Sequence, residues 1–308
     1  MNRTFQYHAQ PRPRPTYEQR SGKVPLIGFE IEKQDEDVRG QDAAQDILER
    51  YGWIKERDGS LCHYTGFELV SPVYSLNENF SEIFKPMEYL INASTNNKGN
   101  KPTEADPDEN LQGYDSDRNR YDVNEAPRAK NCGGHINISH PKFTDSYKLA
   151  QALENYYPLF YAMYKGRLNN HYAEAKNKKT KKQNRFNKYS AFHCKGNGVL
   201  EIRIFSAVKN VSQLLWRIEL IRWMLEHPYR GAASIVGHII NPKSKLNDLL
   251  SKVYSPEGIH NLALSYCKHA EEYNNKKPLN NPEEDVRQMF NRLRESYKAV
   301  NIKDKNQI

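Results

Sequence analysis

The sequence predicts an α+β fold, in which an antiparallel sheet is covered by helices on one face and carries chemistry on the other. The first observation is a set of four short segments in which apolar and polar residues alternate, as they do in strands with one buried face. These segments are residues 28–32 (GFEIE), 66–70 (GFELV), 133–139 (GGHINIS) and 200–205 (LEIRIF). The second observation is a series of longer segments whose apolar residues have helical spacing. Together they indicate one sheet with helices packed against it.

The first elements follow a basic N-terminal segment. Residues 1–23 contain the run PRPRP at 11–15 and almost no apolar residue, so we expect a basic, extended tail. The first strand is expected over 24–33. The spacing of the apolar residues over 42–51 then predicts a helix.

A hairpin is predicted over 53–71, because the sequence RDGS at 57–60 is a turn signal. The helix expected over 80–90 should be kinked or interrupted at Pro86, since proline lacks a backbone donor. Residues 92–130 are rich in Asn, Asp, Gly and Pro. A polar stretch of this length is either a flap over a site or disordered, and both alternatives stay open.

The second half of the chain is predominantly helical by its pattern. Thr144 is a candidate N-cap for a helix that runs to about residue 165. A basic loop follows over 165–188. Beyond the fourth strand, an amphipathic helix is expected over 212–227 and ends before Pro228. Further helices are expected over 245–254, 256–273 and 283–300.

The composition is that of a folded chain with long polar segments. The 308 residues are 37% hydrophobic, and the mean hydropathy is −0.91. The net charge of +8 favours a polyanionic partner such as a nucleotide or a nucleic acid. No apolar run approaches the ~20 residues of a membrane span. With no signal-peptide core and four cysteines without a CxxC pair, we expect a cytoplasmic protein with reduced thiols and no membrane partner.

The polar positions of the strand-like segments carry carboxylates and an imidazole, where an ordinary strand carries a mixture of Thr, Lys and Ser. The set comprises Glu30, Glu32, Glu68, His135 and Glu201. Mg²⁺ and Mn²⁺ bind oxygen-rich groups of this kind, and two ions among four carboxylates would bridge the phosphates of a nucleotide. Arg203 lies two residues beyond Glu201, and its planar guanidinium suits a phosphate oxygen. These residues predict a metal-and-phosphate site on one face of the sheet.

In their order and spacing, the segments resemble the amidoligase family. The motifs are GFEIE at 28–32, DGSL at 58–61 followed by GFELVSP at 66–72, CGGHINIS at 132–139, and LEIRIF at 200–205 before a long helix. The resemblance covers about residues 24–227. The family belongs to the carboxylate–amine ligases, which share a fold with glutamine synthetase and glutamate–cysteine ligase. It implies a glutamine-synthetase-like antiparallel sheet, and formation of an amide bond through an acyl phosphate with ATP and Mg²⁺ or Mn²⁺ as cofactors.

The resemblance also implies a domain organisation and a class of substrates. A basic tail over 1–23 would precede an amidoligase-like catalytic domain over 24–227, which includes the polar flap 92–130 and the basic loop 165–188. Residues 228–308 would form a helical part of the same domain. The substrates would be a carboxylate and an amine, each a small molecule or a peptide, and the sequence is compatible with an oligomer.

Single residues match the metal-binding motifs of the family. Glu30 and Glu32 resemble paired ligands that serve two different metal ions. Glu68 resembles a further ligand of one ion. His135 and Glu201 resemble ligands of the other ion.

Other residues match the nucleotide-binding and catalytic positions. Arg203 resembles the arginine that meets the γ-phosphate of ATP. Arg185 and Lys188 are candidate nucleotide contacts, although similar proteins carry an Arg-Tyr pair where this chain has Lys188-Tyr189. Asn137 occupies a polar position of its motif, and we group it with the cofactor-binding residues. The candidate catalytic residues are Arg203, Glu201 and Asp58.

Several alternatives stay beside the ligase. Asp58 precedes a glycine in a turn signal and is explained equally well as a turn residue. The whole chain could instead be a catalytically inactive member of the fold that binds nucleic acid or has a structural role, as its charge suggests. Retention of every metal-binding residue opposes that reading. A kinase that stops at the phosphorylated product is a third alternative. Zinc is disfavoured, because the cysteine and histidine spacings fit no zinc module.

Overall fold

The structure is a computed structural model of the chain. It describes residues 24–34, 42–57, 61, 66–93, 132–164, 173–174, 176, 185–196 and 198–273, together with residues 288 and 291. The predicted tail 1–23, almost all of the polar stretch 92–130 and nearly all of the helix expected over 283–300 therefore lie outside the described residues. The domain boundaries stay a prediction.

The centre of the fold is a seven-stranded antiparallel sheet. Its strands are β1 (Leu26–Gln34), β2 (Ile54–Glu56), β3 (Gly66–Val70), β4 (Tyr74–Ser75), β5 (Gly134–Ser139), β6 (Phe192–Gly196) and β7 (Val199–Ile202). They pair in the order β2-β3-β1-β5-β7-β6, and β4 pairs with the start of β1. The long strand β1 is central, with hydrogen-bonded neighbours on both sides. The fold is thus a mixed α and β arrangement with an antiparallel sheet, as the sequence predicts.

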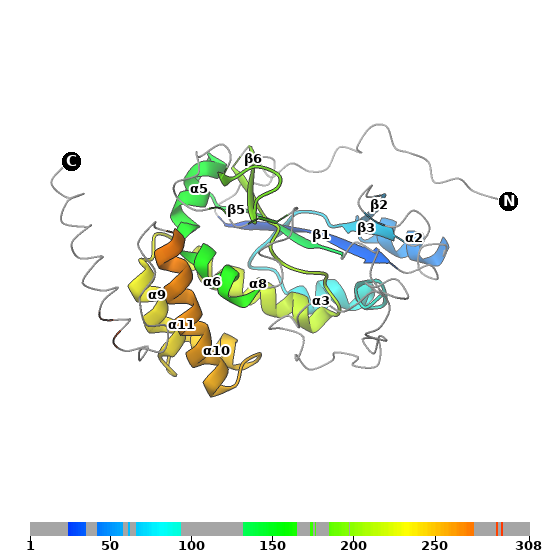
Figure 1. Cartoon of the computed structure of the whole chain (residues 1–308). Coiled ribbons are helices and arrows are strands. Elements are labelled where there is room, and N and C mark those ends of the chain that lie inside the picture. Colours follow the sequence, from blue (N-terminus) through cyan, green and yellow to red (C-terminus); the bar gives the residue numbers. More distant parts are fainter. Residues whose placement is uncertain are drawn as a thin grey trace.

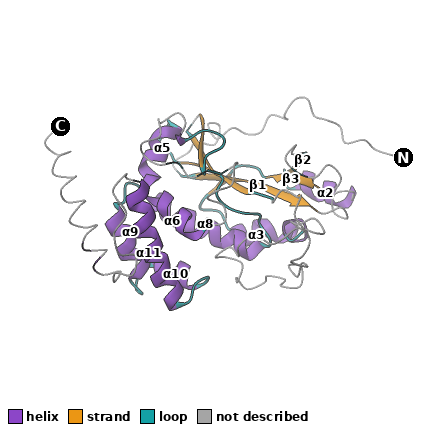
Figure 2. Cartoon of the chain, viewed as in Figure 1, coloured by secondary structure: helices purple, strands orange, loops and turns teal. Residues whose placement is uncertain are grey.

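Helices cover one face of this sheet. They are α2 (Asp42–Arg50), α3 (Phe80–Phe84), α4 (Glu88–Ile91), α5 (Ser146–Leu153), α6 (Tyr157–Met163), α8 (Val211–Glu226), α9 (Ala232–Ile240), α10 (Lys245–Ser251) and α11 (Pro256–Tyr273). Figures 1 and 2 show α3, α8 and α6 lying along one side of the sheet, with α9, α10 and α11 beyond α6. None of the helices that the structure describes is long and apolar enough to cross a membrane.

The apolar side chains of the strands face these helices. Phe29 of β1 is 1% exposed, and its ring lies 6.0 Å from that of Phe80 and 5.5 Å from that of Phe84, both on α3. The equivalent positions of the other strands are equally buried: Phe67, Leu69, Ile136, Ile138 and Ile202. Because side chains alternate along a strand, the residues between them must lie on the opposite face. The predicted phase of the strands is confirmed.

Two predicted features, a hairpin and an interrupted helix, agree with the structure. The hairpin over 53–71 is present as β2 paired with β3, although its turn lies outside the described residues. The helix over 80–90 is broken where Pro86 stands, because the 3₁₀ turn η1 (Lys85–Met87) separates α3 from α4. The interrupted helix thus follows from the missing donor of proline.

The prediction of a single helix from Thr144 to about residue 165 is wrong. Asp145, rather than Thr144, is the N-cap, and its carboxylate accepts a hydrogen bond from the amide of Tyr147 at 2.8 Å. The 3₁₀ turn η3 (Glu154–Tyr156) then separates α5 from α6. Pro158 lies in the first turn of α6, where no amide hydrogen is needed. Inside a continuous helix the same proline would remove a hydrogen bond and clash with the preceding turn.

Other boundaries differ from the expectations. The fourth strand ends at Ile202, so residues 203–205 lie beyond β7, and the helix expected over 245–254 ends at Ser251. Strands β4 and β6 and helix α9 were not predicted. The buried residues of α9, which are Ala232, Ile235, Val236 and Ile239, have helical spacing, so the signal for this helix was present in the sequence. By contrast, α11 has the predicted bounds.

A buried lysine joins three segments under the sheet. Lys33 lies on the core face of β1 and is fully buried. Its ammonium donates to the carbonyl oxygens of Ala93 at 3.0 Å and Val208 at 2.6 Å, and also to that of Ile91. These carbonyls belong to the end of α4 and to the segment before α8. One side chain therefore ties the central strand to both.

We expect Lys33→Met to lower the free energy of unfolding by roughly 3 kcal/mol, because buried acceptors that lose their donor cost about 1–3 kcal/mol each. Urea unfolding followed by circular dichroism measures the change. Lys268→Met, on an exposed position of α11, is the matched control and should stay within about 0.5 kcal/mol of the wild type. Equal midpoints for Lys33→Met and the control would show that the buried ammonium contributes no net stability.

Candidate metal centre

The strand register builds a row of polar side chains across the face of the sheet opposite the apolar side chains of its strands. The directly opposed pairs are Glu32–Glu68, Glu30–His135 and Asn137–Glu201. Opposed residues of antiparallel strands have Cβ atoms about 5 Å apart, so each pair is in contact range. Two carboxylates directly opposite each other repel. A pair such as Glu32 and Glu68 is therefore expected to be stabilised by a cation.

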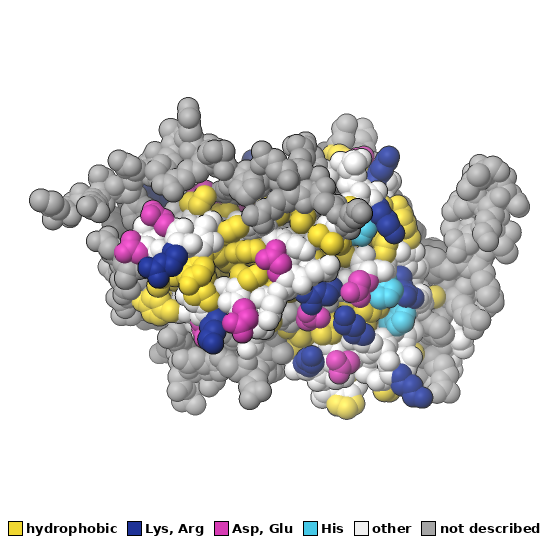
Figure 3. Space-filling view, turned by 180° about the vertical axis from the view of Figure 1, so that it is seen from behind, with side chains coloured by type: hydrophobic (Ala, Val, Ile, Leu, Met, Phe, Trp, Pro, Cys, Tyr) yellow, Lys and Arg dark blue, Asp and Glu magenta, His cyan; other side chains and the backbone are white. Residues whose placement is uncertain are grey.

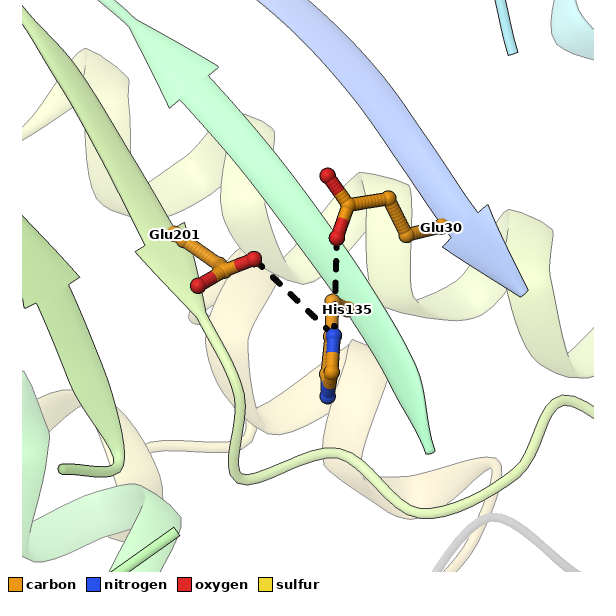
Figure 4. Close-up of side chains that lie close together, drawn as sticks. All are labelled: Glu30, His135 and Glu201. Atoms are coloured by element: carbon orange, nitrogen blue, oxygen red, sulfur yellow. Dashed lines mark ion pairs between the residues drawn. The ribbon is translucent and has the colours of Figure 1, made fainter. Parts of the chain in front are cut away.

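Two groups of candidate ligand atoms share one imidazole. Glu30, His135 and Glu201 each offer an atom within 4.8 Å of the others, and so do Glu32, Glu68 and His135. Figure 4 shows Glu30 from β1 and Glu201 from β7 pointing toward His135 on β5 between them. The five residues predicted as metal ligands thus converge on one face. They divide into two groups that separate Glu30 from Glu32 and share His135, and the assignment of each group to an ion stays a prediction.

The distances from His135 to the carboxylate oxygens leave room for an ion between them. His135 Nδ1 lies 3.6 Å from a Glu30 oxygen and 3.9 Å from a Glu201 oxygen, and His135 Nε2 lies 3.9 Å from a Glu32 oxygen. Hydrogen bonds of this type are about 2.7–3.2 Å long. Two ligands on opposite sides of a Mg²⁺ ion, each at about 2.1 Å, lie about 4.2 Å apart. The oxygen-rich donor set likewise suits Mg²⁺ or Mn²⁺.

His135 presents a different nitrogen to each group. Nδ1 faces Glu30 and Glu201, and Nε2 faces Glu32. A neutral imidazole has one lone pair and one N–H, so only one of its nitrogens can bind an ion. The geometry therefore allows His135 to be a ligand of either group, but of one group at a time.

Two adjacent glycines permit close packing, one inside this site and one beside it. A Cβ atom on Gly133 would lie 2.9 Å from His135 Nε2 and 3.1 Å from a Glu32 oxygen. The Gly133 amide also donates to the Glu32 carboxylate. On Gly134 a Cβ atom would lie 2.5 Å from the backbone oxygen of Ser206. Gly133 therefore makes room for the site, whereas Gly134 makes room for the neighbouring backbone.

Basic side chains surround Glu201, and the sequence indicated only one of them. Arg203 donates to Glu201 at 2.8 Å, so it lies beside the candidate ligands as predicted. His193 Nδ1 lies 2.9 Å from the same carboxylate, and Lys195 donates to Glu201 at 3.2 Å and to Glu30 at 2.8 Å. His193 and Lys195 lie on β6, the strand that was not predicted. The turn sequence GNG at 196–198, ahead of the fourth strand, is the signal that could have identified this hairpin.

These contacts shift the acidity of the carboxylates. Burial by itself raises the pKa of Glu201, but the His193 hydrogen bond and the charges of His135, Lys195 and Arg203 outweigh it, so the pKa is strongly lowered. The pKa of Glu30 is lowered as well, since its contacts with His135 and Lys195 outweigh burial and the repulsion from Glu201. Both groups are therefore carboxylates, ready to bind a cation, at neutral pH.

Of the remaining candidate residues, the structure describes Asn137, Arg185 and Lys188 but not Asp58. Asn137 donates to Glu30 at 2.9 Å, which gives this amide the role of orienting a candidate ligand. The guanidinium of Arg185 lies over the Phe186 ring, and the ammonium of Lys188 lies over the ring of its neighbour Tyr189. Their contact with a nucleotide stays a prediction. The predicted catalytic residue Asp58 lies outside the described residues.

Comparisons with known proteins leave the family open. No protein family matches the sequence, and no curated protein matches it either. Among solved structures, the chain is similar to GmaS without ligand, a gamma-glutamylmethylamide synthetase. The two are 12% identical with a TM-score of 0.34, over 81% of this chain and 68% of the other. A likeness of this size carries no argument about activity.

The two glycines should fail in different ways when they are replaced. We expect Gly133→Ala to weaken Mn²⁺ binding at least about tenfold with little change in stability, because the new methyl group presses on flexible side chains of the site. Gly134→Ala should instead lower the melting temperature, because its methyl group meets backbone. Gly231→Ala, where a Cβ atom meets nothing within 4 Å, is the control. Titration with Mn²⁺ and thermal unfolding separate the two effects, and identical behaviour of both variants would contradict this assignment.

The lowered pKa values predict how stability depends on pH. The folded state binds fewer protons than the unfolded chain at Glu30 and Glu201, whose usual pKa is 4.5. Their contribution to stability is therefore complete above pH ~5 and is lost as the pH falls below 4.5 toward the folded values. In a chelator, we expect the unfolding free energy of Glu201→Gln to fall less steeply than that of the wild type over this range. Parallel curves would contradict the shift.

Proposed function

We propose that the chain is a carboxylate–amine ligase that uses ATP and Mg²⁺ or Mn²⁺ to form an amide bond through an acyl phosphate. The observation that carries the proposal is the presence of two sets of candidate ligands, Glu30 with Glu201 and Glu32 with Glu68, which share His135. The guanidinium of Arg203 lies beside Glu201. The resemblance of the strand motifs to amidoligases supports the same reaction. We propose a carboxylate and an amine, each a small molecule or a peptide, as substrates, and the cytoplasm as the location.

The reaction requires positive charge around a phosphate that is being transferred. Bound ions would offset the charge on the phosphate oxygens during transfer to the substrate carboxylate. Glu30 and Glu201, held as carboxylates by their surroundings, would hold one ion, and Glu32 and Glu68 the other. The contact with Glu201 sets the orientation of the Arg203 guanidinium, whose planar shape suits a phosphate oxygen. Asn137 keeps Glu30 in place.

Nucleic-acid binding is the second candidate function, and the net charge of +8 is the observation that favours it. On the face shown in Figure 3, however, Lys and Arg side chains lie intermixed with Asp and Glu side chains. A protein that binds the phosphate backbone of a nucleic acid is expected to concentrate its basic residues in a stripe or patch. The ligase therefore accounts for more of the structure.

The test of the proposal is ADP release measured with and without a panel of amines and carboxylates. Amine-dependent release supports the ligase, release that depends on the carboxylate alone indicates a kinase, and no turnover in any mixture favours the binding protein. Protein that binds a labelled oligonucleotide but neither hydrolyses ATP nor is stabilised by Mg-ATP would overturn the ligase.

Glu201 and Arg203 should fail in distinguishable ways in this assay. Glu201→Gln keeps the shape but removes a charge from the candidate ion site, so its activity should be partly restored by excess Mn²⁺. Arg203→Lys keeps the charge but loses the planar fork. Its Mn²⁺ binding should persist while turnover falls by roughly 10²–10³, the usual scale for one charge stabiliser of a transition state. Normal turnover of Arg203→Lys would exclude the phosphate contact.

A further inference from the structure

Lys195 occupies an irregular position in the edge strand β6. The regular pairing of β6 with β7 runs as far as Cys194 opposite Leu200, but the next pair is Gly196 opposite Val199. Lys195 is therefore an extra residue, a β-bulge, between two paired ones. Bulges bend a strand and redirect a side chain, and they are frequent next to functional sites. In Figure 1, β6 runs steeply relative to β1.

The ammonium of Lys195 reaches a strand that is not the neighbour of β6. Strands β7 and β5 lie between β6 and β1 in the sheet. Lys195 Nζ nevertheless lies 2.8 Å from Glu30 on β1 and 3.2 Å from Glu201 on β7. Arg203 adds a second positive charge at 2.8 Å from Glu201. The charges of the two carboxylates are thus offset by two side-chain cations of the same chain.

Lys195 and the candidate ion site share one oxygen of Glu201 and divide the two oxygens of the Glu30 carboxylate. Glu201 Oε1 accepts from Lys195 and is also the atom 3.9 Å from His135 Nδ1. Glu30 directs Oε1 to Lys195 and Oε2 to His135. A divalent ion between these three residues would stand next to an ammonium group, and the two cations repel each other strongly at such a distance.

We propose that Lys195 is an internal cation of the Glu30–Glu201 pair, which an ion must displace in order to bind with Glu30, His135 and Glu201. The inference rests on the proposed function, because it takes that group to be an ion site. Lys195 keeps the two carboxylates together while no ion is bound. It also makes this ion site weaker than the same ligands would be alone. Its side chain is 36% exposed, which leaves the ammonium room to move out toward solvent or toward a phosphate.

The experiment measures Mn²⁺ binding without nucleotide, in a Glu68→Gln background that weakens the other group. We expect Lys195→Met to tighten Mn²⁺ binding at least about tenfold in this background, since coupling between close charges commonly exceeds the 1.4 kcal/mol that corresponds to a factor of ten. Lys195→Arg keeps the charge and should bind Mn²⁺ like its parent. In a Glu201→Gln background, which removes one carboxylate of the pair, Lys195→Met should have a much smaller effect.

Thermal unfolding with and without metal provides a second measurement. Without metal, Lys195→Met should melt below the wild type because two close carboxylates lose a shared cation, and Mn²⁺ should raise its melting temperature more than that of the wild type. Unchanged or weaker Mn²⁺ binding by Lys195→Met, with binding by the parent intact, would overturn the proposed role of Lys195 and leave the ion site and the proposed function standing. Absence of Mn²⁺ binding in every variant would overturn the ion site and the proposed function together.

Discussion

The burial of one face of β1 is the constraint on which the rest of the structure depends. Phe29 and Ile31 pack into the helical layer, and this fixes the phase of the central strand. Glu30 and Glu32 are then directed to the other face, and the register delivers Glu68 and His135 opposite them. A slip of one residue would exchange the two faces, burying carboxylates against aromatic rings. The energy of the core thus also determines the geometry of the site.

A row of carboxylates carries an electrostatic cost, which the fold offsets locally. Glu32 accepts from the amide of Gly133, where the absence of a side chain lets the backbone approach. Glu201 is almost fully buried, and His193 and Arg203 stabilise its charged form. The site is therefore organised before any ion arrives. Preorganised groups of this kind are what transfer of a charged phosphate requires, because they need little rearrangement during the reaction.

The hairpin of β6 and β7 links this electrostatic balance to the edge of the sheet. Strand β7 supplies Glu201 as a candidate ligand, and two basic side chains of β6, His193 and Lys195, contact it. Lys195, at the bulge, carries one of these charges as far as Glu30. The same hairpin that completes the acidic row also limits its negative charge. Under our proposal, binding of an ion and movement of this lysine are coupled.

Much of the candidate site could be predicted from the sequence, because the period of a strand is local. Alternation alone assigns Glu30, Glu32 and Glu201 to one face and Phe29 to the other. The interruption at Pro86 was equally predictable, since it depends on one missing donor.

Contacts between distant segments could not be predicted in this way. Nothing local indicates that Lys195 reaches Glu30, because that contact depends on strand order and on a bulge between two particular pairs. The division of the ligands into two groups likewise follows from which strand lies beside which. The sequence by itself determined which residues share a face, because that depends on backbone geometry. Only the tertiary structure decided which of them meet, because strand pairing is chosen by the packing of the whole chain.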